Sequence, residues 1–437
     1  PIPSLDPLRE RATMAAVTRR LIPFLFVLYV VAFLDRVNVG FAALEMNEDL
    51  GFSAAVYGFG AGIFFIGYAL FEVPSNLLLA RMGARRWIAR IMITWGVLAS
   101  GMMFVRGPMS FYVVRFLLGI AEAGFFPGIV FYLSEWYPAK ERARAVARFM
   151  TAIPISGVIG GPVSGLLMQL DGRWGLAGWQ WLFLLEGVPA VILGGVVLGY
   201  LTDRPGEARW LDADQRAWLT ARMAREREVC AEHHGWTVSR ALTSAIVWQM
   251  GVLVFVSISF GQYVLGLWLP QIVRGFSGLS PLGIGVVSAV PNLVAAVAMV
   301  AVAAHSDRTG ERCLHMASAS AAAFVGFLAA AFLESPPLVV AALSLAAAGT
   351  LSAHGPFWPL PSRFLSGPAA AGGIALVNAI ANLSGFVGPW VIGWLNGVSG
   401  DFHTGLLVLA FVPLVGVVLV LRLRQAPELA DPGVPHR

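Results

Sequence analysis

Four ionisable side chains stand inside long apolar segments of this sequence. Asp35 and Arg36 are adjacent, and Arg115 precedes Glu122 by two helical turns, which places both on one face of a helix. A charge at the bilayer centre costs about 2.5 to 3.5 kcal/mol on insertion scales, so such residues are functional candidates. A guanidinium group stays charged, whereas a carboxylate in a membrane can take a proton. The set combines two fixed cations with two switchable anions.

These groups have the chemistry to bind an organic anion together with a proton. With Asp35 and Glu122 ionised, both guanidinium groups are satisfied internally. Protonation of one carboxylate then frees an Arg fork to hold a substrate carboxylate through two hydrogen bonds. The alternative is a static charge network that joins the two segments.

The second half of the chain offers uncharged groups that can select a substrate. They are Gln262, Tyr263, Asn292, His354, Trp358, Asn378 and Asn382. Asn378 and Asn382 are four residues apart and face the same way on a helix. Packing hydrogen bonds are the alternative for each Asn and for His354. Polar groups suit a sugar acid or tartrate and the aromatic rings suit an aromatic acid, so both classes stay open. For Glu72 and Glu186, structural hydrogen bonding is favoured, and a role in transport is the alternative.

Long apolar segments must carry these residues. The chain has 437 residues, of which 57% are hydrophobic and 13% charged, and its mean hydropathy is +0.74. This composition excludes a water-soluble globule. Twelve segments are long enough to cross a bilayer as helices. Their approximate bounds are 21–43, 55–79, 87–106, 109–135, 146–169, 179–201, 243–272, 281–304, 313–334, 336–360, 369–395 and 402–422.

The basic residues predict the orientation of these helices. Of 30 Lys and Arg residues, three fall in predicted outer loops (Arg106, Arg173, Arg274), and Arg36 and Arg115 lie inside helices. The others lie in segments that are cytoplasmic if the N-terminus is inside, as the positive-inside rule requires. We therefore expect a multi-pass protein of the bacterial inner membrane with both termini cytoplasmic. The same distribution argues against a nucleic-acid partner. Cys230 and Cys313 fall at cytoplasmic positions, so no disulfide is expected.

A polar interruption divides the chain into two halves. We predict a six-helix bundle over residues 1–201, a cytoplasmic linker over 202–242 and a second six-helix bundle over 243–437. Arg81, Gly83 and Arg85 recur in the second half as Arg308, Gly310 and Arg312. Such internal repeats are typical of transporters whose substrate site lies between the halves. Because both bundles belong to one chain, a monomer is expected.

The sequence lacks the residues that several energy sources and catalytic chemistries require. Lys140 is the only lysine and is followed by Glu141, so the sequence has no G-x-x-x-x-G-K-[ST] phosphate loop. No Cys and His cluster has zinc spacing, and no nucleophile stands with a base. We expect neither an enzyme nor a cofactor or metal. Uphill transport would draw on a proton gradient.

Five phrases carry a family resemblance that covers nearly the whole chain. They are FLDRVNVGFA, GYALFEVPSNLLLARMGARRW, RFLLGIAEAGFFPG, GWQWLFLLEGVPAV and AHSDRTGER. They resemble the anion:cation symporter family of the major facilitator superfamily, whose bacterial members import tartrate, galactonate, phthalate and hydroxyphenylacetate. The resemblance implies an all-α fold of twelve membrane helices in two six-helix bundles.

The resemblance also implies roles for individual residues. Asp35 and Glu122 match the family's proton-coupling pair, Arg36 its main carboxylate ligand and Tyr68 a further ligand, while Arg115 pairs with Glu122 or substrate. Asp307, Arg308, Gly310 and Arg312 match a cytoplasmic loop motif that acts as a charge latch. In the first-half copy, formed by Arg81, Gly83 and Arg85, the acidic position is Ala80, so that latch is altered. The helix over 243–272 lacks the Arg of glutamate carriers, which argues against their substrate mode.

The function that we predict from the sequence is import of a small organic anion in symport with protons. A proton-coupled exporter or an anion exchanger of the same fold is the main alternative. A membrane-bound sensor or enzyme is disfavoured, because the linker is too short for a catalytic domain.

Overall fold

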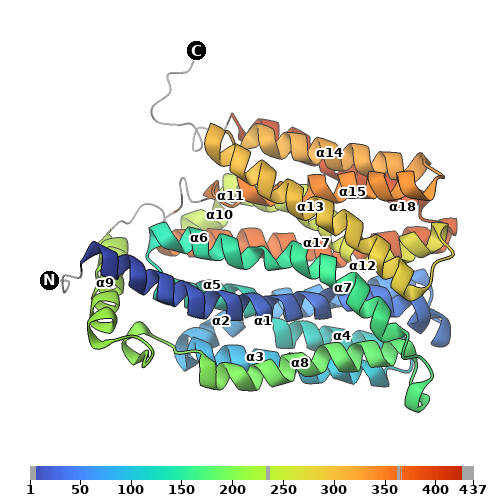
Figure 1. Cartoon of the computed structure of the whole chain (residues 1–437). Coiled ribbons are helices and arrows are strands. Elements are labelled where there is room, and N and C mark those ends of the chain that lie inside the picture. The colour runs from blue at the N-terminus through green and yellow to red at the C-terminus, as the bar shows by residue number, and fades with distance from the viewer. Residues whose placement is uncertain (1–5, 233–236, 362–364, 366, 426–437) are drawn as a thin grey trace.

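The computed structural model describes residues 6–232, 237–361, 365 and 367–425, and in these ranges the secondary structure is helical without a β-strand (Figure 1). The first-half helices are α1 (Pro7–Asp49), α2 (Ala54–Met82), α3 (Ala84–Gly101), α4 (Pro108–Glu122), α5 (Phe125–Trp136), α6 (Ala139–Met150), α7 (Ala152–Met168) and α8 (Gly178–Tyr200). Helices α9 (Ala213–Glu232) and α10 (Val238–Thr243) follow. The second half contains α11 (Ala245–Val254), α12 (Phe260–Phe276), α13 (Pro281–Thr309), α14 (Cys313–Phe332), α15 (Pro336–Ser352), α16 (His354–Phe357), α17 (Gly367–Ser399) and α18 (His403–Leu423). Short turns are η1 (Met102–Phe104), η2 (Arg173–Gly175), η3 (Pro205–Glu207) and the π-helical η4 (Phe255–Ser259).

Twelve helical spans are long and apolar enough to cross a membrane, as predicted. Their outer surface carries large exposed apolar side chains, such as Leu77 at 62%, Val97 at 57% and Val297 at 64%. Buried charged residues lie inside, among them Arg115 and Glu122. Apolar side chains outside and charged side chains inside are the reverse of the arrangement in a water-soluble protein. This surface fits a surrounding lipid bilayer.

Four predicted spans are interrupted helices. The span over 109–135 breaks between α4 and α5 because Gly124 has a φ of +85°, which favours glycine. The first-half span 146–169 joins α6 and α7, the span 243–272 contains the π-helical turn η4, and the span 336–360 breaks after Ser352. Irregular backbone at membrane depth is tolerated where it is buried in protein or lines a cavity.

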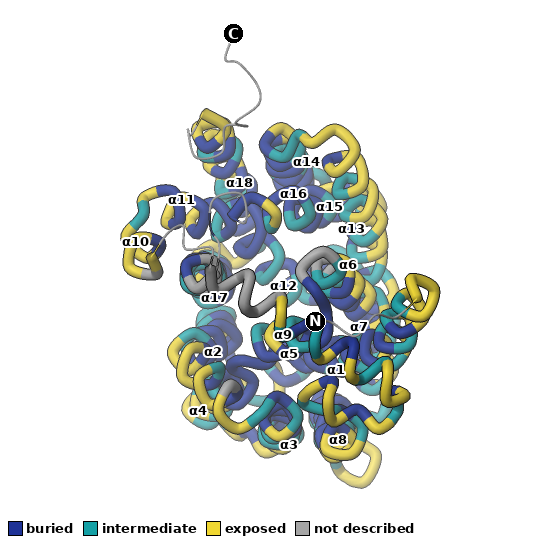
Figure 2. The backbone as a smooth tube through the Cα atoms, turned by 90° about the vertical axis from the view of Figure 1, so that its left-hand side faces the viewer, coloured by how far each residue is buried: buried dark blue, intermediate teal, exposed yellow. Residues whose placement is uncertain are grey.

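Within each half, the helices pack against one another. In the first half, α1 packs against α7 and α8, α3 against α8, and α2 against α4. In the second, α14 packs against α15 and α18, α13 against α15, and α11 against α17. Figure 2 looks along the helices and shows α2, α3, α4 and α8 in its lower part and α14, α15 and α18 in its upper part. The halves meet through α2 with α17, α7 with α13, and α1 with α12.

One end of the molecule, which we call the closed end, is sealed by contacts between the halves. It is the end at which α1 and α17 terminate, opposite α9 (Figure 1). The Tyr57 hydroxyl donates to the Leu267 carbonyl at 2.7 Å, and Arg274 donates to the Leu44 carbonyl. Close backbone approaches strengthen the seal, since a Cβ on Gly165 would lie 2.6 Å from the Pro281 oxygen.

Candidate functional site

Arg36 and Glu122 form a buried, hydrogen-bonded ion pair between α1 and α4. Their exposed fractions are 8% and 1%. The Arg36 guanidinium lies 5.6 Å from the Phe64 ring centroid and 5.3 Å from that of Tyr68, both on α2. Aromatic faces attract a desolvated cation, so these rings help to hold the guanidinium in place.

Arg115 has a different environment from Arg36. Its Nη2 donates to the Ala61 carbonyl of α2 at 3.0 Å, and its guanidinium stacks 4.9 Å from the Phe64 centroid. It is 1% exposed. Glu122 therefore pairs with Arg36 and not with the Arg on its own helix, and Arg115 ties α4 to α2.

Asp35 points into the first bundle and forms no ion pair in the described part of the chain. Its carboxylate accepts hydrogen bonds from Trp95 Nε1 of α3 and, at 3.2 Å, from Asn38 Nδ2. Glu186 of α8 is a second buried carboxylate of this bundle and accepts from the Ser164 hydroxyl at 2.8 Å. The sequence led us to expect that both carboxylates would neutralise the two Arg side chains. The structure has instead one ion pair, between Arg36 and Glu122, and one carboxylate, that of Asp35, held by hydrogen bonds.

Sequence reasoning did not identify Trp95 and Asn38 as partners of Asp35. Asn38 follows Asp35 by three residues on one helix, so helical spacing carries a signal for that contact. Trp95 lies on another helix, and nothing in the sequence marks its approach.

A central cavity lies between the two halves beside the Arg36 and Glu122 pair. Eight predicted substrate-binding residues line it: Arg36, Tyr68, Gln262, Tyr263, His354, Trp358, Asn378 and Asn382. Further lining comes from apolar and aromatic residues of both halves, including Tyr29, Phe33 and Phe126. The structure thus brings one guanidinium and a set of neutral hydrogen-bonding groups to a single cavity.

The neutral groups of the second half are already connected to one another. His354 Nε2 and Gln262 Oε1 are 2.9 Å apart, and Trp358 Nε1 lies 3.3 Å from His354 Nδ1. Because the indole can only donate, Nδ1 accepts, and Nε2 carries the proton that it donates to Gln262. This assigns one neutral tautomer to His354 and leaves the amide NH₂ of Gln262 available to the cavity.

Asn378 and Asn382 on α17 contact a carboxylate of the other half. Asn378 Nδ2 donates to Glu72 Oε1 at 2.7 Å, and Asn382 Nδ2 lies 3.4 Å from Glu72 Oε2. The Tyr263 hydroxyl donates to Asn382 Oδ1 at 2.9 Å. Helical spacing correctly placed the two Asn residues on one face, but their partner Glu72 is on α2.

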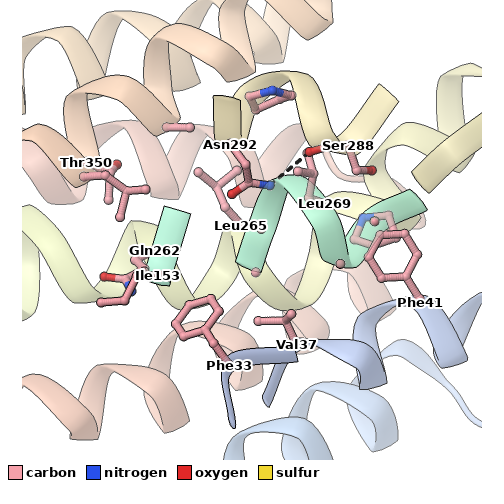
Figure 3. A pocket seen from close by; sticks show the side chains of 18 residues that line it. Phe33, Val37, Phe41, Ile153, Gln262, Leu265, Leu269, Ser288, Asn292 and Thr350 are labelled. Atoms are coloured by element: carbon pink, nitrogen blue, oxygen red, sulfur yellow. Dashed lines mark hydrogen bonds between the residues drawn. The ribbon is translucent and has the colours of Figure 1, made fainter. Parts of the chain in front are cut away.

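Asn292 lies in a neighbouring cavity of apolar character (Figure 3). Its Nδ2 donates to the Ser288 carbonyl one turn earlier at 3.0 Å. Figure 3 shows Phe33, Val37, Leu265 and Leu269 around it. The structure therefore separates Asn292 from the cavity of Arg36, although Phe33, Ile153 and Gln262 line both.

The two copies of the loop motif both contain a carboxylate contact. In the second half, Arg312 pairs with Asp307 at 2.6 Å, and Gly310 ends α13 with a φ of +70°. Arg308 is exposed.

In the first-half copy, Arg81 is exposed and Gly83 ends α2 with a φ of +89°. The Arg85 backbone N–H donates to Asp203 Oδ1 at 2.7 Å, and its side chain lies 3.9 Å from Oδ2. Asp203, from the segment after α8, thus supplies the acid that the sequence lacks at Ala80.

The twelve spans, the two halves and the cavity between them define a secondary transporter of the major facilitator fold. The chain belongs to the Major Facilitator Superfamily, because the sequence model of that family matches residues 25–373. This match confirms the superfamily and the fold that we predicted from the five phrases of the sequence.

The chain is similar along nearly its whole length to transporters of bacteria. It is 53% identical over 433 residues to a protein of Agrobacterium vitis named "Putative tartrate transporter", covering 98% of this chain and 99% of that protein. It is 41% identical to the "Quinolone resistance transporter" of Acinetobacter baumannii, with 94% of each chain covered.

Solved structures support the fold. A bacterial homologue of the human lysosomal transporter Spinster, in an inward-facing and occupied conformation, matches with a TM-score of 0.77 and 15% identity. The match covers 98% of this chain and 100% of that chain.

Proposed function

We propose that the protein imports a small organic anion in symport with protons by alternating access. The observation that carries this proposal is the Arg36 and Glu122 ion pair beside a cavity walled by both halves. A buried Arg whose only ion-pair partner is a carboxylate is released when that carboxylate takes a proton. The freed fork then suits a substrate carboxylate.

Proton and anion binding are linked in this scheme. Adding substrate alone would place two carboxylates on one guanidinium, and adding a proton alone would leave a buried cation unpaired, which is costly. Loading both restores one ion pair in the cavity. The site then has the same charge when empty and when fully loaded, which allows both forms to reorient.

Asp35 serves as a proton-binding group apart from the anion. Trp95 and Asn38 hold its carboxylate without a cation, so its ionised form depends on two hydrogen bonds. Arg115 acts in this scheme by positioning α4 against α2, since its fork already bonds the Ala61 carbonyl.

The charge distribution supports the orientation that we propose, and import is the direction that we propose with it. We place both termini in the cytoplasm of a bacterial cell, so the closed end faces outward and substrate leaves toward the cytoplasm. The bundles over 1–201 and 243–437 rock about the cavity, joined by the linker 202–242. The proton gradient is the energy source, no cofactor takes part, and a monomer suffices.

A hydroxylated acid fits the cavity best. Gln262, Tyr263, Asn378 and Asn382 supply neutral donors and acceptors opposite Arg36. The tartrate transporter name of the 53% identical relative supports the same class.

Export of an aromatic carboxylate is the second candidate, with anion exchange as its variant. The quinolone resistance relative and the apolar cavity next to the central one favour it. Arg36 would serve the same purpose there, with the proton moving against the substrate.

The deciding experiment uses purified protein in liposomes and labelled tartrate, sugar acids and aromatic acids, with and without an inward proton gradient. We expect gradient-driven accumulation of one acid, lost in Arg36→Ala and uncoupled in Glu122→Gln. Accumulation by Glu122→Gln equal to that of the wild type would refute its coupling role. If protons drive efflux of an acid instead, the export candidate replaces import.

A further inference from the structure

Glu72 has a buried carboxylate whose hydrogen bonds join the two halves of the molecule. It lies on α2, is 6% exposed, and is bonded by the side-chain amides of Asn378 and Asn382 on α17. In the described residues, the hydrogen bonds of Asn47, Tyr57 and Arg274 also join the two halves, and these lie at the closed end. Glu72 joins the halves at the cavity itself, where Tyr263 of α12 also lies within hydrogen-bonding range of Arg36.

The two Asn side chains form a preorganised site for a carboxylate. Because Tyr263 donates to Asn382 Oδ1, the amide oxygen is engaged and the NH₂ group is directed to Glu72. Both carboxylate oxygens of Glu72 are occupied, one by each amide. These Asn residues line the same cavity as Arg36, so the cavity contains a second carboxylate-binding position on its opposite wall.

The hydrogen bonds to the Glu72 carboxylate come from neutral donors, and Arg36 of α1 is the nearby cation that acts on its charge. Glu72 forms no ion pair in the described part of the chain, and its backbone carbonyl bonds its neighbour Asn76. A carboxylate that loses both amide donors inside a membrane is left charged and unsatisfied, and uptake of a proton relieves that cost.

We propose that Glu72 occupies, in the empty protein, the position of a second carboxylate of the substrate. This inference rests on the proposed function and makes the substrate a dicarboxylate. One carboxylate binds Arg36, and the other displaces Glu72 from Asn378 and Asn382. The displaced Glu72 takes a proton, so a dicarboxylate is bound with one proton more than a monocarboxylate, and the added negative charge is balanced.

The competing interpretation is a structural bond that holds α2 to α17. Such a bond would affect all substrates alike and would not change the number of protons bound. The two interpretations therefore predict different numbers of protons bound with the substrate.

The test is calorimetric titration of the purified full-length protein with L-tartrate and with the monocarboxylate D-galactonate, in two buffers of different ionisation enthalpy. We expect wild-type protein to take up more protons, up to about one, with tartrate than with galactonate near pH 8. Glu72→Gln should remove that difference, because a displaced amide needs no proton. Asn378→Ala should weaken tartrate binding about tenfold and galactonate binding less than about threefold.

Two matched variants control for general damage. Asn396→Ala removes an Asn of α17 that lines neither of the two cavities, and Glu45→Gln removes a carboxyl group near the closed end of α1. Both should keep the wild-type proton difference.

Each remaining outcome overturns a stated claim. Equal proton uptake for the two acids in wild-type protein, or a difference that persists in Glu72→Gln, overturns the inference. Binding of galactonate but not tartrate overturns the inference and leaves the proposed function intact. Binding of neither these nor the other organic acids by folded wild-type protein overturns the proposed function itself.

Discussion

Two buried guanidinium groups share the ring of Phe64 but differ in what they bond. Arg36 has a carboxylate partner that can be neutralised, whereas Arg115 has a backbone carbonyl that cannot. In the proposed cycle, a proton frees the first and leaves the second in place. The same residue type would then bind the anion at one position and hold two helices together at the other.

The two Arg residues should respond differently to loss of the fork. Arg36→Lys keeps the charge but removes bidentate binding, so we expect the KM for the transported acid to rise about tenfold or more. Arg115→Lys should change KM little and lower the midpoint of thermal unfolding, because Lys cannot both stack on Phe64 and reach Ala61. Uptake kinetics and a thermal melt in detergent measure the two effects. Equal KM changes in both variants would contradict the distinction.

Asp35 offers a second test at the residue scale. Asp35→Asn keeps an oxygen for Trp95 and Asn38, so we expect a folded protein. It cannot bind and release a proton, so accumulation driven by the gradient should disappear while exchange of labelled for unlabelled substrate remains. Counterflow and gradient-driven uptake in the same liposomes separate these activities. Retained accumulation would exclude Asp35 from coupling.

At the scale of helices, the sequence predicted which segments cross the membrane better than how they bend. Apolar length alone located all twelve spans, because a hydrocarbon core demands it. The break at Gly124 and the π-helical turn at Phe255–Ser259 were not predicted, because tertiary packing selects them.

Contacts between helices were predicted only where residues share a helix face. Asn378 and Asn382 were correctly paired by spacing, whereas their partner Glu72 and the Asp203 contact of Arg85 join segments distant in sequence. The pairing of Arg36 with Glu122 was among the options because both are charged, but spacing favoured Arg115. Helical periodicity shows which residues share a face of one helix, but it gives no information about the distance between two helices.

Close packing of α7 on α13 provides a prediction for the closed end. A side chain at Gly165 would meet the Pro281 oxygen and, at 2.8 Å, the Leu282 Cα, so Gly165→Leu should hold the halves apart there. Gln271 lies at the closed end on α12, where it accepts a hydrogen bond from Asn47 of α1. We expect Gln271→Cys, in a background without native Cys, to react about tenfold faster in the Gly165→Leu protein with an impermeant maleimide added outside cells.

Gly195→Leu is the matched control, because nothing lies within 4 Å of a Cβ at that position of α8. It should leave the labelling rate of Gln271→Cys unchanged. An unchanged rate in folded Gly165→Leu would show that α7 and α13 do not seal this end.

For the whole molecule, every step of the proposed cycle depends on which end faces the cytoplasm. The closed end carries the exposed Trp174, on the turn η2 between α7 and α8. The opposite end carries the exposed Arg209, which follows η3 and precedes α9. The excess of Arg in the segments of this second end is the reason why we propose that it faces the cytoplasm.

Orientation is therefore tested with one Cys at each end, again in a background without native Cys. Trp174→Cys should react in intact cells with an impermeant maleimide, and Arg209→Cys should react only after permeabilisation. This pattern would make the sealed end external and both termini cytoplasmic, as proposed. The reversed pattern would place the sealed end inside and overturn that assignment of the termini, whereas the direction of proton-driven transport is decided by the uptake measurements in liposomes.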